Sequence, residues 1–387
     1  MHQTRVLLAA MSLDLGGAET HVITLAQELA RRGRHVAVVS QGGRLASNLE
    51  SCGIAHHFAP LHSRSPISLY RAVRAISTLV ARERPDVLHA HARIPAWACS
   101  IATCGAIPLV VTYHGVYAAG FPWNFVTVPG DLTVAVSEDV ADHLAARFGF
   151  ERGRTRVILN GIDTSRFSPS VDPSDARARF GISGHPLILH VSRLSADFAH
   201  TATQVIPAAM ALLKDYPYLQ VVIVGDGDRL REIRTAAERA NESCGRAVIT
   251  VTGGCEDMPP IYAAADVVVG VARVALEAMS CGKPVVLAGE GGLRGLLDEE
   301  IMEDAISHNF TARGCGREIT PGNLEAEIRR AIGGGRQGAE LGDAGRGIVL
   351  ERYSIEKMVD DIESVYNEVS QGPGRAKSGD KRGRTGP

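Results

Sequence analysis

Short apolar runs alternate with amphipathic stretches along the first half of the chain. Apolar residues at three- and four-residue spacing indicate a helix, whereas a short continuous apolar run bounded by polar residues indicates a buried strand. In residues 18–32, for example, Val22, Leu25 and Leu29 share one helical face. The pattern predicts strands at 5–11, 35–40, 86–90, 109–113, 132–136 and 157–159, and helices at 18–32, 67–84 and 137–148.

The second half repeats this alternation. Strands are predicted at 187–191, 220–224 and 248–252, and helices at 203–214, 229–242 and 258–264, followed by two apolar runs on either side of a short helix. Repeated strand–helix units predict parallel sheets covered by helices. We therefore expect an α/β protein with two doubly wound domains, at 1–168 and 169–350, then a helix at 351–370 and a disordered basic tail at 371–387.

Length and composition agree with this class. A chain of 387 residues is long enough for two domains, and a net charge of −2 gives no field that would favour nucleic acid. The seven cysteines contain no C-x-x-C pair, so we expect no zinc cage or disulfide framework and a reducing, cytoplasmic location. The uncharged stretch 94–130 is interrupted by prolines, which favours a buried helix and strand over a membrane span.

The segment from Val267 to Val286 carries the strongest chemical signal. An apolar run ends in the loop Gly270–Val274, and a helix then begins and carries Glu277. Free amides at a helix start bind phosphates, and a carboxylate one turn further on suits ribose hydroxyls. The pattern predicts a nucleotide diphosphate site that includes Gly270, Ala272, Arg273, Val274 and Glu277.

Other candidates follow predicted strands. The glycine pairs Gly16-Gly17 and Gly225/Gly227 suit close approach of a phosphate, although each is also compatible with an ordinary tight turn. Neither carries the dinucleotide-binding spacing G-x-G-x-x-G.

An arginine and several histidines also stand at strand ends. Arg193 follows strand 187–191 and could clamp a diphosphate, or simply be solvated. His114 follows strand 109–113, where open α/β sheets bind ligands, and could instead be a structural loop residue. His89 and His91 lack carboxylates at metal-ligand spacing, so we expect structural or acceptor-side roles for them and no metal site.

Taken together, these segments resemble the family 4 glycosyltransferases. The matching stretches occur in the family's order at 16–19, 86–91, 111–115, 136–138, 160–163, 192–194, 224–227 and 276–285. The resemblance implies the GT-B fold, with two Rossmann-like domains facing a cleft. It also implies retaining transfer of a hexosyl group from a nucleotide diphosphate sugar, without a metal or another cofactor.

The resemblance also assigns roles. Gly17 would face the donor phosphates, His114 the transferred sugar, Arg193 the diphosphate and Glu277 the ribose. Gly16, Asn160, Gly225 and Gly227 would complete the donor site, and the last helix would cross back to the first domain.

Two family positions differ. Phe198 stands where the family has a lysine on the diphosphate, and Val269 stands where it has a glutamate on the donor sugar. We hypothesise that Arg273 replaces the missing lysine as a third catalytic residue beside His114 and Arg193; the alternative is that Arg273 pairs with Glu277 or points to solvent. The losses also leave open a catalytically impaired binding partner or a GT-B sugar-nucleotide epimerase.

The expected acceptor is a glycan or a lipid-linked molecule. The aromatic loop 118–128, with Phe121, Trp123 and Phe125, suits sugars or lipid tails, or forms a packed lid. The basic helix 67–84 could rest on the inner face of an anionic membrane, or simply be solvated.

Overall fold

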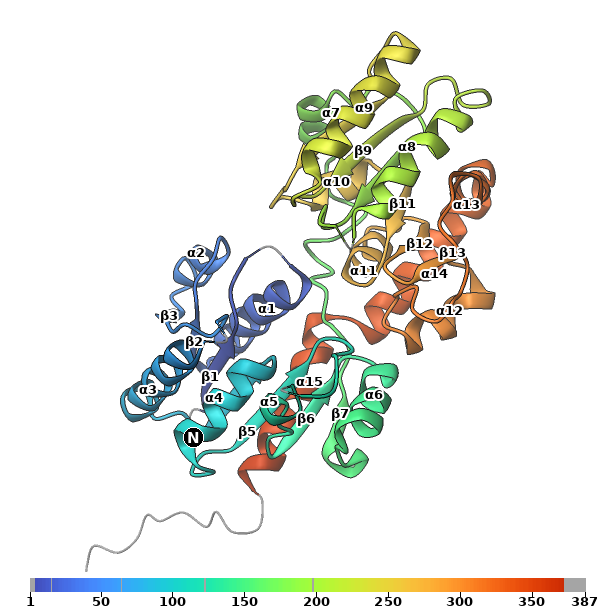
Figure 1. The fold of residues 1–387 in the computed structure, drawn as a ribbon. Helices are drawn as coiled ribbons and strands as arrows, with labels where there is room; N and C mark the ends of the chain where they lie inside the picture. Colours follow the sequence, from blue (N-terminus) through green and yellow to red (C-terminus); the bar gives the residue numbers. More distant parts are fainter. Residues whose placement is uncertain (1–3, 15, 64, 122, 197, 372–387) are drawn as a thin grey trace, which may run out of the picture. The chain divides into compact units, whose positions relative to one another are not determined.

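The computed structural model describes residues 4–371, except 15, 64, 122 and 197. The chain divides into two compact units (Figure 1). Unit 1 runs to Ile158 and takes up the chain again from Glu356, and unit 2 runs from Leu159 to Ile355.

Unit 1 is built on a seven-stranded parallel sheet in the order β3-β2-β1-β4-β5-β6-β7. Its strands are β1 Arg5–Ala10, β2 His35–Ser40, β3 Ala55–Phe58, β4 Val87–His91, β5 Leu109–Tyr113, β6 Leu132–Ala135 and β7 Thr155–Val157. Its helices are α1 Gly17–Arg31, α2 Ala46–Glu50, α3 Pro66–Glu83, α4 Arg93–Thr103, α5 Trp123–Val126, α6 Glu138–Phe148 and α15 Ile355–Ser370, with a 3₁₀ turn at Arg152–Arg154.

The last helix, α15, belongs with unit 1 although unit 2 lies between them in sequence. Arg32, after α1, forms ion pairs with Asp360 at 2.6 Å and with Glu363 at 3.0 Å. Inside the unit, Tyr366 bonds to His89. Apolar residues of α15 such as Ile362 are buried, so an amphipathic face fixes the helix in unit 1.

Unit 2 has a six-stranded sheet in the order β10-β9-β8-β11-β12-β13. All pairs are parallel except β12–β13. The strands are β8 Leu187–Val191, β9 Gln220–Val224, β10 Ile249–Gly253, β11 Val267–Gly270, β12 Val285–Gly289 and β13 Gly292–Leu296. The helices are α7 Ser174–Phe180, α8 His200–Leu212, α9 Leu230–Cys244, α10 Pro259–Ala264, α11 Arg273–Ser280, α12 Glu299–Ser307, α13 Pro321–Gly333 and α14 Arg336–Arg352.

In each sheet, the chain adds strands first toward one edge and then toward the other, so the strand order reverses at one place. In unit 1 the chain moves outward from β1 to β3 and returns to add β4 beside β1. In unit 2 it moves outward from β8 to β10 and returns to add β11 beside β8. Ligands of open α/β sheets bind at the carboxyl ends of strands beside such a reversal.

The predicted fold class is confirmed by these two sheets. The strands 35–40, 109–113, 187–191 and 220–224 have the predicted bounds. The pattern missed β13, whose glycines and arginine give no apolar run. That strand forms because it pairs with the edge of β12.

The linking segment 159–168 belongs to unit 2, whereas the sequence placed it at the end of the first domain. Ile162 and Phe167 are buried in the core of unit 2, and the amide of Ile162 donates to the carbonyl of Tyr353 at 2.7 Å. The expected tail 371–387 lies outside the described residues beyond Gln371.

The uncharged stretch 94–130 forms α4, β5 and α5 with their connections. Within the described part of the chain, no helix has both the length and the hydropathy that crossing a bilayer requires.

Candidate functional site

In unit 2, the predicted site residues gather at the carboxyl ends of β8 and β11. The two strands pair in parallel, with His190 opposite Val269. Arg193 therefore follows one strand of the reversal, and the loop 270–274 follows the other. This is the place where the topology alone predicts a ligand.

Glu277 is buried on α11, and both of its carboxylate oxygens accept hydrogen bonds. Oε1 accepts from Nε of Arg273 at 2.8 Å, and Oε2 accepts from the Tyr262 hydroxyl at 2.9 Å. Burial, together with the Glu277 carboxylate, raises the pKa of Tyr262 well above its ordinary value, so this hydroxyl stays a donor.

Arg273 therefore adopts one of the alternatives considered above, the pair with Glu277. The two side chains are only 13% and 11% exposed. Nη1 of Arg273 also donates to the carbonyl of Gly161 at 3.3 Å, which brings the segment containing Asn160 beside α11. The guanidinium and the carboxylate neutralise each other at the start of the helix.

Arg193 differs from Arg273 in its surroundings. Its side chain is exposed, and among the described residues it takes part in no ion pair. Its guanidinium carbon lies 5.9 Å from the centroid of the Phe198 ring. At this edge, Arg193 is thus a positive charge without a carboxylate partner in the described part of the chain.

The glycines after β9 support the Arg193 loop by close packing. A Cβ on Gly225 would lie 2.0 Å from the carbonyl oxygen of Ser192, and one on Gly227 would lie 2.4 Å from the carbonyl carbon of Leu194. The amide of Leu194 donates to the carbonyl of Asp226 at 2.9 Å. These contacts give both glycines a packing role, whether or not a phosphate also approaches them.

The loop 270–274 offers fewer amides than the sequence suggests. The Ala272 amide donates to the Phe310 carbonyl at 2.8 Å, and the Val274 amide donates to the Val271 carbonyl at 3.2 Å. Gly270 is required by packing, because a Cβ there would lie 2.4 Å from Cγ1 of Val274. Arg273 is the first residue of α11, so its amide has no helical acceptor.

Ala272 has φ 54° and ψ −123°, a backbone conformation that strains any residue with a Cβ. The strained residue directly precedes α11 and sets the direction in which the helix leaves β11. Strain of this kind is concentrated at functional sites.

The two departures from the family pattern have different surroundings. Val269 is fully buried in the apolar core, and its carbonyl accepts from Nδ1 of His190 at 2.9 Å. Burial lowers the pKa of His190 to about 4, so this ring is neutral. Phe198 lines a pocket of about 430 Å³, together with His200, Thr201, Gly289–Gly292 and Gly316–Ile319.

In unit 1, the corresponding reversal lies between β1 and β4. Gly16 precedes α1, and its carbonyl accepts from both the amide and the hydroxyl of Thr20, at 2.9 and 2.8 Å. Gly17, the first helical residue, is exposed. The start of α1 is therefore open, as the predicted phosphate contact requires.

His114 is half-buried directly after β5 and belongs to a group that the sequence did not bring together. Its Nε2 lies 3.2 Å from Nδ1 of His91. Its ring centroid is 4.9 Å from that of His21, on α1. His21 was missed because it was read only as part of the helix packed on the sheet, and nothing local marks it as chemical.

His89 has a structural environment, one of the two roles expected for it. Its Nδ1 bonds to the Tyr366 hydroxyl and its Nε2 to the Thr112 hydroxyl, both at 2.7 Å. It therefore ties α15 to the sheet from inside unit 1.

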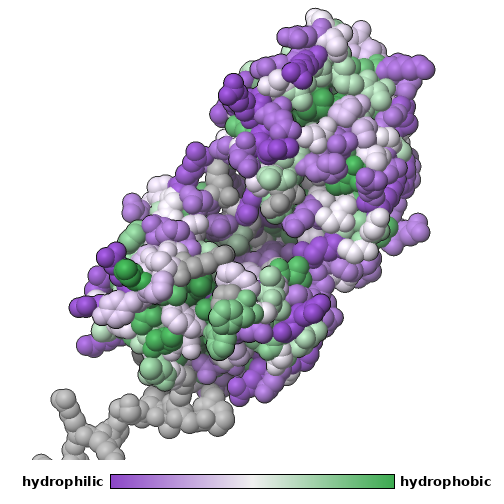
Figure 2. All heavy atoms as spheres, in the orientation of Figure 1, coloured by the Kyte–Doolittle hydropathy of each residue, from purple (hydrophilic) through white to green (hydrophobic). Residues whose placement is uncertain are grey.

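The aromatic loop is not a packed lid in the described structure. Phe121 and Phe125 are 86% and 72% exposed, with ring centroids 6.0 Å apart. Trp123 lies against Arg93, whose guanidinium carbon is 5.6 Å from the indole centroid. On the face drawn in Figure 2, hydrophobic residues gather in patches among hydrophilic ones.

Comparison with known proteins agrees with both halves of this description. Residues 15–166 match the model of Glycosyltransferase Family 4, and residues 185–312 match that of Glycosyl transferases group 1. Together the two matches account for most of the chain.

Two relatives differ in how much of their length aligns with this chain. The D-inositol 3-phosphate glycosyltransferase of Geodermatophilus obscurus is 27% identical over 92% of this chain and 86% of its own length. The sulfoquinovosyl transferase SQD2 of Arabidopsis thaliana is 27% identical over 62% of this chain, which spans half the length of that relative.

Among solved structures, HepE of Anabaena in complex with UDP and glucose superposes with a TM-score of 0.75. It is 22% identical, and the match covers 94% of this chain and all of HepE. The likeness shows the fold. With the two family matches and the two sheets described above, the chain belongs to the family 4 glycosyltransferases of GT-B fold.

Proposed function

We propose that the chain is a retaining glycosyltransferase that moves a hexosyl group from a nucleotide diphosphate sugar to a glycan or a lipid-linked acceptor. The observation that carries the proposal is Arg193, which is exposed and takes part in no ion pair with the described residues, at the strand reversal of unit 2 that also holds the start of α11 and Glu277. The HepE complex with UDP and glucose and the transferase names of the relatives support the substrate class.

Donor binding would exchange the partners of two side chains. Ribose hydroxyls would take Oε1 of Glu277, where Arg273 now donates. The released guanidinium would then turn to the diphosphate, because a bound dianion offers it a stronger partner than solvent. Tyr262 would hold the carboxylate in place throughout the exchange.

The chemical step requires stabilisation of the departing diphosphate. Arg193, with Arg273 after the exchange, would supply the positive charge that the family obtains partly from the lysine replaced by Phe198. His114 is neutral, since burial lowers its pKa to about 4, and would hydrogen-bond the transferred sugar through Nδ1, because its Nε2 faces His91.

A thermal-shift screen with UDP, GDP, ADP and their sugars tests the donor site. A bound donor raises the melting temperature by mass action, and the effect grows with concentration. We expect one base to give the shift and Glu277→Gln to abolish it. The absence of any shift with all three bases would remove the proposed function.

The partner exchange has its own test. Arg273→Ala should weaken donor binding less than it lowers turnover, since Arg273 would meet the diphosphate most strongly as it departs. Unchanged values of both would assign Arg273 a structural role. NMR of the first-formed product then decides retention, which requires the anomeric configuration of the donor.

A second candidate, a non-catalytic sugar-nucleotide-binding partner, is favoured by Val269 in the core and by Phe198 in place of a lysine. Assays for sugar transfer and donor hydrolysis distinguish the two candidates. Donor binding without transfer or hydrolysis, across a wide acceptor screen, supports the binder. Isomerised donor would instead indicate the epimerase alternative.

We further propose that α3 contacts an anionic membrane surface on the cytoplasmic side, which would suit a lipid-linked acceptor. Ile67 and Tyr70 are 66% and 65% exposed, and Arg71 and Arg74 are exposed on the same helix. Cosedimentation with anionic vesicles should be lost in Arg71→Glu/Arg74→Glu. Equal sedimentation with neutral vesicles would oppose this proposal.

A further inference from the structure

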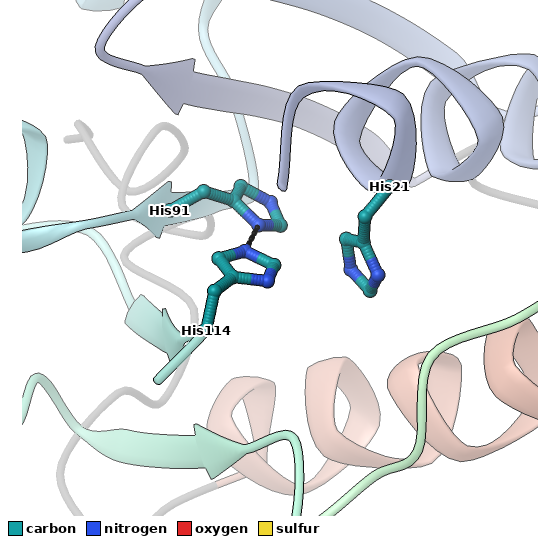
Figure 3. Close-up of side chains that lie close together, drawn as sticks. All are labelled: His21, His91 and His114. Carbon is teal, nitrogen blue, oxygen red and sulfur yellow. Dashed lines mark hydrogen bonds between the residues drawn. The ribbon is translucent and has the colours of Figure 1, made fainter. Parts of the chain in front are cut away.

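Three imidazoles converge inside unit 1 from three different elements. His21 comes from α1, His91 ends β4 and His114 follows β5 (Figure 3). One ring nitrogen from each residue lies within 4.8 Å of those of the other two. His21 and His91 are nearly fully buried, at 2% and 4% exposed.

The sheet register explains why the strand histidines meet. His91 pairs with Thr112 across β4 and β5, and side chains two residues apart share one face of a strand. His114, two residues after Thr112, therefore continues the face that carries His91. Because α1 packs on the sheet, His21 is brought to the same place.

The spacing suits a shared cation. Nδ1 of His91 and Nε2 of His114 are 3.2 Å apart. Two imidazole nitrogens on one tetrahedral zinc, each at about 2.0–2.1 Å from the ion, stand roughly 3.3–3.4 Å apart. A metal can thus lie between these two nitrogens with little movement of either ring, once the proton that they share moves to the other nitrogen of the ring that carries it. The His21 nitrogen lies within 4.8 Å of both and would move closer to complete the site.

The neighbouring His89 supports this arrangement without joining it. Its ring lies 4.1 Å from that of His91, centroid to centroid. Both of its nitrogens are already used, by Tyr366 and Thr112. Its fixed ring limits how His91 can rotate, as residues behind a metal ligand do.

We propose that His21, His91 and His114 form a binding site for a zinc-class divalent cation, with a fourth position left for water or another oxygen ligand. Three imidazole nitrogens select borderline ions such as Zn²⁺ or Co²⁺ over Mg²⁺ and Ca²⁺, which prefer oxygen. Three protein ligands with one open position are typical of zinc sites that exchange ligands rather than only brace a fold.

The test uses the full chain after treatment with EDTA and dialysis. Titration calorimetry with Zn²⁺ should give one ion per chain, and Co²⁺ should give the intense visible absorption of a tetrahedral site. His21→Gln and His91→Gln should each weaken Zn²⁺ binding at least about tenfold, because each removes a ligand. The matched control is His62→Gln, an exposed histidine of the same unit.

Three outcomes overturn the proposal: no stoichiometric uptake, equal loss in His62→Gln, or unchanged binding in both ligand variants. Circular dichroism melts identify a variant that fails to fold. In that case the Co²⁺ spectrum of the unmodified chain decides alone. The weak visible absorption of octahedral Co²⁺ would contradict the proposed tetrahedral site. Nucleotide binding is measured separately in EDTA, so failure of the metal site leaves the donor proposal intact.

Discussion

The two strand reversals occupy equivalent places in the two sheets but present different chemistry. Beside β1 and β4, unit 1 presents three imidazoles, those of His21, His91 and His114. Beside β8 and β11, unit 2 presents charged groups, Arg193 and the Arg273–Glu277 pair. Parallel topology fixes where a ligand is expected, and the side chains decide which ligand it is.

Burial explains why each edge holds the groups it does. A buried imidazole avoids the cost of charge by staying neutral, so several can stand together. A buried guanidinium cannot lose its proton and needs a carboxylate, which Glu277 provides for Arg273. Arg193 needs none because it is exposed. The guanidinium that has no carboxylate partner among residues the structure describes is therefore the one at the surface, where an anionic ligand can reach it.

The largest expected effect comes from restoring the family glutamate with Val269→Glu. Val269 is in the core, so the new carboxylate would be buried without a partner and should lower the free energy of unfolding by roughly 3–5 kcal/mol. Chemical denaturation measures this, with Val269→Thr as a control of similar size. A stable Val269→Glu with faster transfer would show that this edge accepts the family chemistry after all.

Next is Arg193→Ala, which tests whether charge is what separates unit 2 from unit 1. Removing one positioned group that stabilises the leaving diphosphate should reduce turnover about 10²–10³-fold. The melting temperature should not change, because the side chain is exposed. Arg336→Ala, which removes a 93% exposed guanidinium, is the control and should leave turnover unaltered. Equal turnover in both variants would contradict the assigned role.

Lowering the pH should reduce the free energy of unfolding of the two units unequally. Urea unfolding in the presence of EDTA measures this. An unfolded histidine binds a proton below about pH 6.5. Folded His190 does so only near pH 4, and folded His89 only near pH 3. Between these values the unfolded state binds more protons, so stability is full above pH 6.5 and falls as the pH drops.

Each such histidine contributes up to about 1.4 kcal/mol per pH unit to that fall. His190→Asn should make the decline of the unfolding free energy with falling pH shallower by the contribution of one histidine. The free energy of unfolding should fall more steeply with decreasing pH in unit 1, which has several buried histidines, than in unit 2. Stability that stays flat from pH 7 to pH 5 would refute the neutral state of these rings.

The smallest expected effect is that of Ala272→Gly at the start of α11. Glycine relieves the positive φ and should stabilise the protein by about 1 kcal/mol. Ala275→Gly, inside the same helix and fully buried, should instead destabilise it by about 0.5–1 kcal/mol or more, because it loses helix propensity and a packed methyl group. Two changes of the same sign would argue against strain at residue 272.

Much of the fold was predictable because parallel sheets are made of local apolar runs. The strands at 187–191 and 220–224 and the helix carrying Glu277 follow from periodicity alone. What periodicity could not give is a strand such as Gly292–Leu296, whose formation depends on a distant edge. Nor could it place residues 159–168, which belong to unit 2 through the burial of Ile162 and Phe167.

The candidate site was predictable in its members but not in their partners. Sequence order placed Arg193 after one strand and Arg273 and Glu277 in the loop and helix after another, and the structure has them after β8 and at the start of α11. Only the packed structure shows that Arg273 donates to Glu277, that the Ala272 amide is used by Phe310, and that glycines 225 and 227 pack against the Arg193 loop.

By itself, then, the sequence determined two α/β domains and a set of polar residues at the ends of strands, because hydrophobic periodicity and strand-end chemistry are local properties. The tertiary structure alone decided that His21 joins His91 and His114 and which charges are compensated. The three histidines stand tens of positions apart in the chain, and only folding brings them within a few ångströms of each other. Arg273 and Glu277 are only four residues apart, but their pairing depends on the burial that the packed structure imposes on both side chains.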